Sequence, residues 1–473
     1  MVTKPYFAVT RRPPKVKLSK AEIHSHVHTL PELRFEDQQL TSYAGSVVLQ
    51  ALFRKLDLKN RLRRCFAHLP EGQVVGYPTI CIILVVHIML GFRRLRDIDR
   101  YHDDPVVART LGLKRIPHVS TICRALQRMD SRSADEVGKL NRDIVLERLE
   151  YENLPRVTLD FDGSVITSTR FAEGLAVGYN KQKKGGRSYY PLFCTIAQSA
   201  QVLDVQHRPG NVHDSNGAPA FIKSCIDRVR DHLPQAVIES RKDSAFFSDE
   251  TVSLLASEGV LFTVSVPFER FAELKGIIES RKHWRSFSRD WSYFESWWSP
   301  KSWDTEYRFL FYRHRVRIQN KEPIQLDLFA PVVHGYEFRV IITNKQESAK
   351  NVLAFHNGRG SQENIFSELK SQCNMDYVPT RRLSGNRVYC LSSILAYNLF
   401  KELQMTCMKP ARISLRKRPT LWEFSEPRTI RQYILHRAGR LTNPHGQLSL
   451  TMSGNSVTMH DFQRYLQPLL NTA

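Results

Sequence analysis

Residues 157–165 read Val-Thr-Leu-Asp-Phe-Asp-Gly-Ser-Val, and the predicted fold is built around this stretch. Apolar and polar residues alternate, which is the period of a β-strand. The alternation puts Asp160 and Asp162 on one face of an otherwise apolar strand. Because a buried, unpaired carboxylate is costly, cations of the fold, a metal ion or a substrate must neutralise them. A structural alternative stays open, since an aspartate at a strand end often caps a turn such as Gly163 would supply.

Composition indicates a soluble globular protein with a strongly basic balance. The 473 residues suffice for two or three domains, with 42% hydrophobic and 25% charged residues. Lysine and arginine number 69 against 47 aspartates and glutamates, a net charge of +22, and the pI is about 9.7. Such an excess serves solubility alone or, more often, indicates a polyanionic partner such as nucleic acid.

The cysteines and the apolar runs exclude several classes of protein. The eight cysteines are scattered singly, which argues against zinc modules and disulfide scaffolds and fits a reducing compartment. The longest apolar run, residues 80–90, is far shorter than the ~20 residues that span a bilayer. Residues 1–40 begin with a cluster of cations and have no apolar signal core, so we expect a flexible basic arm and no membrane association.

The next part, residues 41–150, is predicted to be a helical DNA-binding domain. Within it, residues 117–129 have the pattern of an amphipathic helix with Ser120 as its N-cap. Arg124 and Arg128 would face outward, which suits a helix that docks in a DNA groove. An ordinary amphipathic surface helix fits the same pattern.

From residue 157 onward the pattern is that of an α/β protein. Two further strands, 189–198 and 202–207, complete a predicted antiparallel meander. Helices and strands then alternate, with helices at 217–233 and 248–258 and strands at 236–240 and 260–266. A strand at 336–343 and helices at 348–372 and 385–405 follow, and the region 406–473 is basic and mixed.

An insertion interrupts this pattern at residues 268–335. Five of the six tryptophans fall here, interleaved with cations, and we expect a separate strand-rich subdomain. Of the adjacent Trp297 and Trp298, one must face away from the core of a strand, and we predict that it is Trp298. An exposed ring beside cations is a stacking platform for an unpaired base, whereas the alternative is a small subdomain with a tryptophan core.

Two further stretches carry candidate chemistry. On the helix around residues 355–370, Arg359, Glu363 and Lys370 lie within about 40° of one another, and His356 sits beside them. This face is either an i,i+4 ion pair worth ~0.3–0.5 kcal/mol or a metal-binding glutamate flanked by phosphate-binding cations. Asp243 follows a predicted strand, at the edge where open α/β sheets bind ligands, although a turn aspartate is often structural.

These motifs together resemble the DDE transposases of bacterial insertion sequences. The matching segments are Asp162-Gly163-Ser164, Asp243-Ser244-Ala245-Phe246 and His356-x2-Arg359-x3-Glu363-x6-Lys370. The subgroup that they resemble has a Tyr-x2-Arg-x3-Glu-x6-Lys signature, and His356 stands where that signature has tyrosine. Residues 178–181, 190–192 and 359–364 resemble its insertion-sequence group thirteen-eighty in particular. The resemblance covers roughly residues 155–405.

The resemblance implies a ribonuclease-H-like catalytic core with a mixed five-stranded sheet, formed by residues 151–267 and 336–405. It implies an active site of Asp162, Asp243 and Glu363 that holds two Mg²⁺ or Mn²⁺ ions, with Asp160 in a supporting place. Magnesium prefers oxygen ligands, and two such ions activate a nucleophile and stabilise the leaving oxygen of a phosphodiester.

The implied partners are double-stranded DNA, as terminal inverted repeats and target, and a second copy of the chain in a synaptic complex at the bacterial nucleoid in the cytoplasm. The candidate DNA-binding residues are Arg359, Lys370, His356, Lys181, Lys183, Lys184, Arg187, Trp298, Arg124 and Arg128. Two other functions compete with a transposase. One is a structure-specific nuclease that cuts without joining, and the other is a domesticated DNA-binding protein without catalysis.

Overall fold

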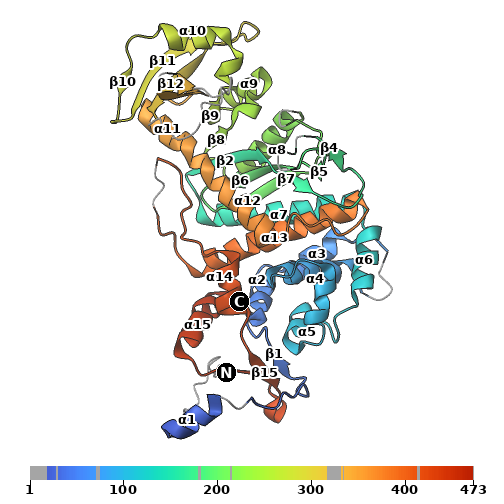
Figure 1. Cartoon of the computed structure of the whole chain (residues 1–473). Helices are drawn as coiled ribbons and strands as arrows, with labels where there is room; N and C mark the ends of the chain where they lie inside the picture. Colours follow the sequence, from blue (N-terminus) through green and yellow to red (C-terminus); the bar gives the residue numbers. More distant parts are fainter. Residues whose placement is uncertain are drawn as a thin grey trace.

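The computed structural model describes residues 19–27, 30–70, 75–178, 180, 183–213, 216–316, 332–333, 335–412 and 416–471. A large sheet with helices on both sides forms one half of the molecule, and a helical half lies below it in Figure 1. The fold is therefore mixed α/β, as predicted. None of the described helices has the length and apolar character needed to cross a membrane.

The centre of the large sheet is the strand β2 (Arg156–Gly163), which contains the opening sequence motif. On one side β2 pairs with β6 (Leu192–Ile196), which pairs with β7 (Gln201–Gln206), and both pairings are antiparallel. On the other side β8 (Val237–Lys242) and then β9 (Leu261–Ser265) run parallel to β2. The predicted meander and the alternating strands are thus present in one sheet.

The described strands of the tryptophan-rich insertion belong to the large sheet. The insertion is strand-rich as predicted, with β10 (Arg285–Ser286), β11 (Trp291–Trp298) and β12 (Tyr307–Arg315). However, β12 pairs along β14 (Tyr336–Thr343), and the end of β14 pairs with β9. Among the described residues this sheet therefore has ten strands, because the strands of the insertion extend it edge to edge beyond β7, β6, β2, β8 and β9.

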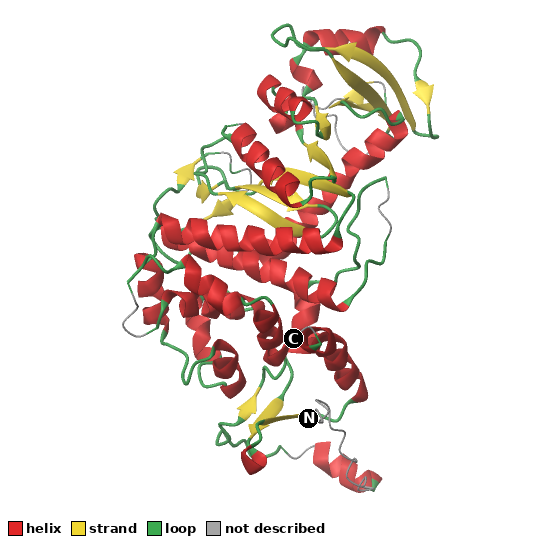
Figure 2. Cartoon of the chain, turned by 180° about the vertical axis from the view of Figure 1, so that it is seen from behind, coloured by secondary structure: helices red, strands yellow, loops and turns green. Residues whose placement is uncertain are grey.

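Helices cover both faces of the sheet near β2. Figures 1 and 2 show α8 (Ala218–His232) on one side, and α7 (Ser131–Glu152) and α13 (Leu383–Cys407) on the other. The predicted single helix at 348–372 is broken into α11 (Ala349–Asn357) and α12 (Ser361–Ser371). A 3₁₀ turn joins them.

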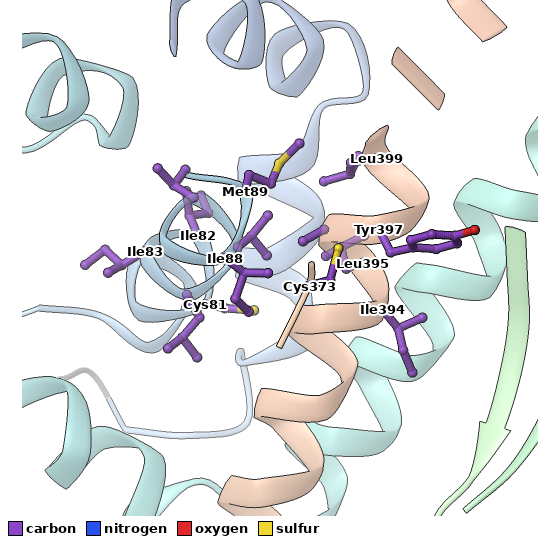
Figure 3. Close-up of a cluster of buried hydrophobic side chains, with 14 of the residues drawn as sticks. Cys81, Ile82, Ile83, Ile88, Met89, Cys373, Ile394, Leu395, Tyr397 and Leu399 are labelled. Atoms are coloured by element: carbon purple, nitrogen blue, oxygen red, sulfur yellow. The ribbon is translucent and has the colours of Figure 1, made fainter. Parts of the chain in front are cut away.

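The elements from Ser46 to Glu152 are helices, as predicted, and they share a core with α13. The most apolar of them, α4 (Tyr77–Met89), is buried along nearly its whole length. Figure 3 shows Cys81 and Ile88 of α4 beside Leu395 of α13. The long apolar run of the sequence is thus a core helix, and packing against a distant helix explains why it is hydrophobic all round.

The helix α6 (Val119–Arg128) has the predicted faces but a different cap. Arg124 and Arg128 are exposed. The predicted N-cap Ser120 is wrong, since the cap is His118, whose Nδ1 accepts a hydrogen bond from the Ser120 backbone nitrogen at 3.2 Å. An imidazole acceptor can satisfy a free N–H of the first turn as a hydroxyl does.

The sequence predicted a flexible basic arm at residues 1–40. Part of this arm, α1 (Lys20–Val27), is helical in the structure. The first 18 residues of the arm lie outside the described residues. Beyond it, β1 (Leu40–Thr41) pairs with β15 (Gly439–Thr442), which pairs with β16 (Ser449–Met452). This small sheet joins a segment near residue 40 to the segment at residues 439–452 (Figure 1).

Candidate active site

The pairing of β2 with β8 brings two of the candidate aspartates to one edge of the sheet. The parallel register runs from Arg156 opposite Val237 to Asp160 opposite Arg241. Continued by two residues, it puts Asp162 alongside Asp243, about one strand spacing of ~4.8 Å apart in backbone terms. Both lie where a strand ends, so their side chains are available to a ligand at this edge.

Both aspartates also hold the turns that follow their strands. Asp162 Oδ1 accepts from the Gly163 backbone nitrogen at 2.8 Å. Asp243 Oδ1 accepts from the Ala245 nitrogen at 3.0 Å and caps a short 3₁₀ helix. Each carboxylate thus has a structural role in its turn, as the structural alternative required, in addition to the proposed role as a ligand.

The third candidate, Glu363, lies on a helix that is anchored to the same strand. The neighbouring Gln362 is buried and donates its Nε2–H to the backbone oxygen of Asp160 at 3.0 Å. Glu363 itself is exposed. In the turn before the helix, Arg359 Nη1 donates to Asp162 Oδ2 at 3.1 Å. Among the described residues, Arg359 thus pairs with the carboxylate of Asp162. Within this part of the chain, it does not form the i,i+4 ion pair with Glu363 that was one of the two alternatives.

The described residues contain no group of three or more histidine, cysteine, aspartate or glutamate side chains close enough to hold a metal ion. What the fold supplies is one aspartate at the end of β2, one directly after the paired strand β8, and a glutamate on a helix that is fixed to β2. Their donor atoms are carboxylate oxygens, which are the ligands that Mg²⁺ and Mn²⁺ prefer. The donor set fits such ions.

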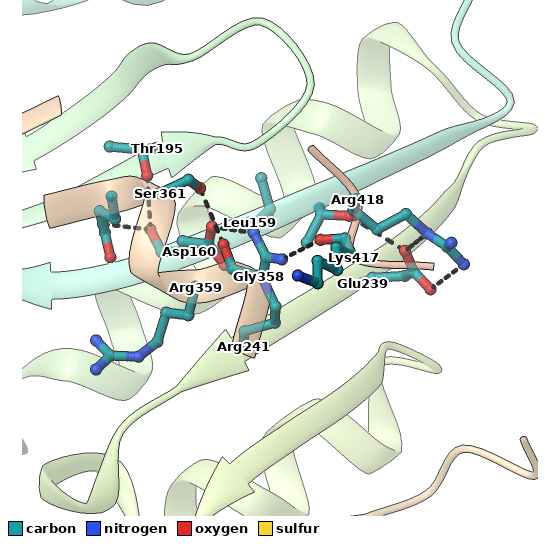
Figure 4. A network of polar contacts seen from close by, with 12 residues as sticks. Leu159, Asp160, Thr195, Glu239, Arg241, Gly358, Arg359, Ser361, Lys417 and Arg418 are labelled. Carbon is teal, nitrogen blue, oxygen red and sulfur yellow. Dashed lines mark hydrogen bonds and ion pairs between the residues drawn. The ribbon is translucent and has the colours of Figure 1, made fainter. Parts of the chain in front are cut away.

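Asp160, the alternative first ligand, is occupied by a buried arginine. Arg241 donates from Nε to Asp160 Oδ1 at 2.7 Å and from Nη2 to Oδ2 at 2.5 Å, and both side chains are almost fully buried. Arg241 also donates from Nη1 to the backbone oxygens of Phe355 and Lys417, at 3.2 and 2.7 Å. Figure 4 shows this network beside Arg359. A cation of the fold therefore neutralises Asp160, one of the outcomes that the sequence allowed.

A second buried carboxylate is Glu239, which lies two residues before Arg241 on β8. It was not singled out from the sequence. Lys345 Nζ, Arg418 Nε and Arg156 Nη1 contact its oxygens at 2.6, 2.9 and 2.9 Å. Burial by itself would raise the pKa of Glu239, but the hydrogen bonds from Arg418 and Lys345 outweigh it and lower the pKa. This cluster ties the segment at Arg418 to the sheet (Figure 4).

His356 is held by the neighbouring strand β9. Its Nδ1 lies 3.0 Å from Thr263 Oγ1 and its Nε2 lies 2.8 Å from Ser265 Oγ. Burial, helped by the positive charge of Arg359, lowers the pKa of His356 to about 3. A neutral ring with both nitrogens engaged is a poor phosphate ligand, so we propose that His356 positions α11 on β9 and does not contact DNA.

We expect the change His356→Gln to flatten the pH dependence of stability. The unfolded histidine takes up a proton near pH 6.5 and the folded one only near pH 3, so the unfolded state binds more protons between these values. The contribution is fully present above pH 6.5 and is lost, by about 1.4 kcal/mol per unit, as the pH falls. Urea unfolding over this range measures it, and a slope equal to that of the wild type would contradict the assignment. The salt dependence of DNA binding should stay unchanged in this variant.

The other predicted DNA-binding cations differ in burial. Burial lowers the pKa of Lys370, and the charges of Asp376 and Asp162 act in the opposite direction. Lys183, Lys184 and Arg187 are exposed on the loop and strand that follow β2. Lys181 lies outside the described residues.

The prediction for the tryptophan pair is wrong. Trp298 packs against Phe309 and Phe271, with ring centroids 5.1 and 5.8 Å apart, and it faces the core together with Phe294. Trp297 is the ring that points away, with 62% of its surface exposed. Any stacking surface on this strand is therefore at Trp297.

Comparisons with known proteins were made for the sequence and for the structure. No curated protein matches the chain. Among solved structures, the piggyBac transposase in a cryo-EM synaptic complex with hairpin DNA is similar at a TM-score of 0.44 and 12% identity, over 83% of this chain and 80% of that one. The Mos1 transposase paired-end complex with the left transposon end matches at a TM-score of 0.18 and 9% identity, over 33% and 52%.

The sequence comparison with protein families covers nearly all of the chain. The model described as "Transposase DDE domain group 1" matches residues 29–473. This range includes both aspartates at the sheet edge and the helix of Glu363. The chain belongs to this family of DDE transposases.

Proposed function

We propose that this chain cuts DNA at the ends of an insertion element and joins the freed 3′-hydroxyl to target DNA. The observation that carries the proposal is the parallel pairing of β2 with β8, whose register, continued by two residues, would align Asp162 with Asp243. The anchoring of α12 to β2 through Gln362 supports the inclusion of Glu363, the next residue on this helix. In this proposal, Asp162, Asp243 and Glu363 hold divalent metal ions.

The strand order supports a ribonuclease-H-like core. Five neighbouring strands run in the order β7, β6, β2, β8 and β9, antiparallel on one side of β2 and parallel on the other. We assign this core to residues 151–267 and 336–405, and the DNA-binding helical part to residues 41–150. Assignment to insertion-sequence group thirteen-eighty rests on sequence motifs alone.

The residues around the carboxylates have different roles in the proposed phosphodiester chemistry. When bound, two Mg²⁺ or Mn²⁺ ions supply Lewis-acid activation of the nucleophile and of the leaving oxygen. Arg359 contacts Asp162 and Lys370 follows on α12, and in this proposal their charges offset the phosphate of the DNA backbone. Arg241 pairs with Asp160 and neutralises its charge, so Asp162 is not needed for this pairing.

The proposed partner is double-stranded DNA, bound by two copies of the chain. The net charge of +22 favours a polyanion. The exposed Arg124 and Arg128 of α6 suit contact with a DNA groove, and the exposed Lys183, Lys184 and Arg187 suit contact with the strand being cut.

We expect opposite results for the two adjacent tryptophans. Trp298→Ala should destabilise the fold by about 2 kcal/mol, somewhat less than the ~3–5 kcal/mol of a fully buried tryptophan. Trp297→Ala should leave stability within ~0.5 kcal/mol, since the ring is exposed. If the exposed ring stacks on a flipped base, worth ~1–3 kcal/mol, Trp297→Ala should spare the first nick and impair the second-strand step.

Thermal unfolding and the fluorescence of 2-aminopurine at the element end test this pair. Equal fluorescence in the wild-type and Trp297→Ala complexes would show that no base stacks on this ring. A destabilised Trp297→Ala variant would contradict the observed packing of the strand.

A cleavage assay with Mg²⁺ tests the proposed function as a whole. Its substrate is a duplex carrying the inverted repeat that flanks the coding region, mixed with target DNA. Joined product supports a transposase, cut but unjoined product supports a structure-specific nuclease, and binding alone supports a DNA-binding protein without catalysis. The family and the intact motif residues favour the first outcome.

A further inference from the structure

A cavity of about 520 Å³ lies beside β7, and none of the three candidate carboxylates lines it. It is lined by β7 and the residues that follow it, by α7 and α8, and by the start of α13. Its charged lining residues are four arginines (Arg142, Arg208, Arg228 and Arg387) and one aspartate, Asp204. The cavity wall thus carries an excess of three positive charges, which is unusual for a structural ion-pair cluster.

Three of these guanidinium groups have hydrogen-bond donors to spare. Arg142 Nη1 and Arg228 Nη1 both donate to Asp204, at 3.0 and 2.8 Å. Arg387 Nη2 donates to Asp135 at 2.6 Å. A guanidinium has five N–H donors, and within the described part of the chain each of these three has a single recorded acceptor. The shared aspartate fixes two of the arginines without saturating them.

The histidine of the cavity wall adds a further unsatisfied group. His207 packs against Tyr189 with ring centroids 4.5 Å apart and the rings tilted by 56°, and its buried Nε2 has no hydrogen-bond partner among the described residues. Burial, together with the charge of Arg387, lowers the pKa of His207 to about 3, so the ring is neutral and can present one N–H. A buried polar atom without a partner is rare, and a ligand is one way to satisfy it.

The cavity lies on the same edge of the sheet as the aspartates. Asp162 is opposite Phe193 of β6, and Phe193 is opposite Val205 of β7, which lines the cavity. Two strand spacings amount to ~10 Å. Along one DNA strand, which rises ~3.4 Å per nucleotide, this distance corresponds to about three nucleotides.

We propose that this arginine cavity binds a backbone phosphate of the DNA, within about three nucleotides of the bond that is cut. Arg228 and Arg387 supply the forked donors that suit a phosphate, and His207 supplies a single N–H. The inference rests on the proposed function, since it names a second DNA contact for the same reaction. It fixes the strand on the side of Asp162 opposite to β8.

The test compares Arg228→Gln and Arg387→Gln with a matched control, Arg230→Gln. Arg230 is on the same helix as Arg228, has similar exposure, 41% against 37%, and also pairs with a carboxylate, but it does not line the cavity. The readout is the affinity for the inverted-repeat duplex as a function of salt, with thermal unfolding as a check on folding. Arg387→Gln keeps the experiment decisive if Arg228→Gln is unstable, because its partner Asp135 is 66% exposed.

We expect each cavity variant to weaken binding about tenfold and to reduce the salt slope by about 1, while the control behaves as the wild type. Neutral methylphosphonate linkages near the cleaved bond should remove the difference between variant and wild type. If both variants bind as the wild type does and the wild type cleaves DNA, the proposed phosphate site in the cavity is contradicted and the proposed function stands. A wild-type chain that neither binds nor cuts the duplex would overturn both.

Discussion

The variant Asp162→Asn is expected to lose strand cleavage by at least about 10³-fold while it still binds DNA. Loss of a metal ligand removes several kcal/mol of transition-state stabilisation, and about 1.4 kcal/mol corresponds to a factor of ten in rate. Asparagine has the same shape and can still accept the hydrogen bond from the Gly163 nitrogen, so the turn after β2 should be preserved. Cleavage of the inverted-repeat duplex and its binding affinity are the two measurements.

Two controls make this result specific. Asp227→Asn removes a carboxylate from an exposed ion pair with Lys223, outside the site, and should leave cleavage unchanged. Asp162→Glu keeps the charge and should retain some cleavage. Full cleavage by Asp162→Asn would mean that Asp162 is not a metal ligand. Substitution by Asp160 would not explain such a result, because Arg241 holds both oxygens of Asp160.

The second large effect is expected for Arg241→Met, which leaves Asp160 buried without its cation. Breaking a buried ion pair by removing one partner costs about 3–5 kcal/mol, because the remaining charge is desolvated and unpaired. Arg241 also serves the backbone oxygens of Phe355 and Lys417, so its loss loosens the attachment of α11 to the sheet. Urea unfolding measures the change, with Arg230→Gln as the exposed-pair control.

The double variant Asp160→Leu with Arg241→Met separates charge from packing. Replacing a whole buried ion pair by apolar residues is often nearly neutral, so the double variant should be more stable than Arg241→Met alone. If both variants lose the same stability, the cost comes from the lost backbone contacts of Arg241 and not from the unpaired charge of Asp160.

Local sequence patterns predicted most of the elements near the site. The helix α9 (Asp249–Ser257) begins after Ser248, whose hydroxyl accepts from the Thr251 nitrogen, as its sequence suggested. The strand β14 has the predicted bounds. These features depend on residues close together in the chain, where periodicity and capping rules apply.

Contacts between distant segments could not be predicted in the same way. Glu239 pairs with Lys345 and Arg418, which follow it in the sequence by 106 and 179 residues. Pairing of β12 with β14 and of β14 with β9 likewise depends on which edges meet, and local periodicity says nothing about that.

The error at Trp298 has a different cause. Both faces of β11 carry aromatic rings, because Trp291 and Tyr293 pack on one side and Phe294 and Trp298 on the other. With apolar residues on both faces, the alternation does not tell which of two adjacent tryptophans is buried.

Metal binding, measured without reference to activity, tests the central claim most directly. Mn²⁺ is titrated into the wild-type chain bound to the inverted-repeat duplex, and the bound ions are counted by electron paramagnetic resonance. We expect up to two bound ions in the wild type and weakened or lost binding in Asp162→Asn, Asp243→Asn and Glu363→Gln, with Asp227→Asn unchanged. Equal Mn²⁺ binding by the wild type and all three site variants would contradict the assignment of these carboxylates as the metal ligands.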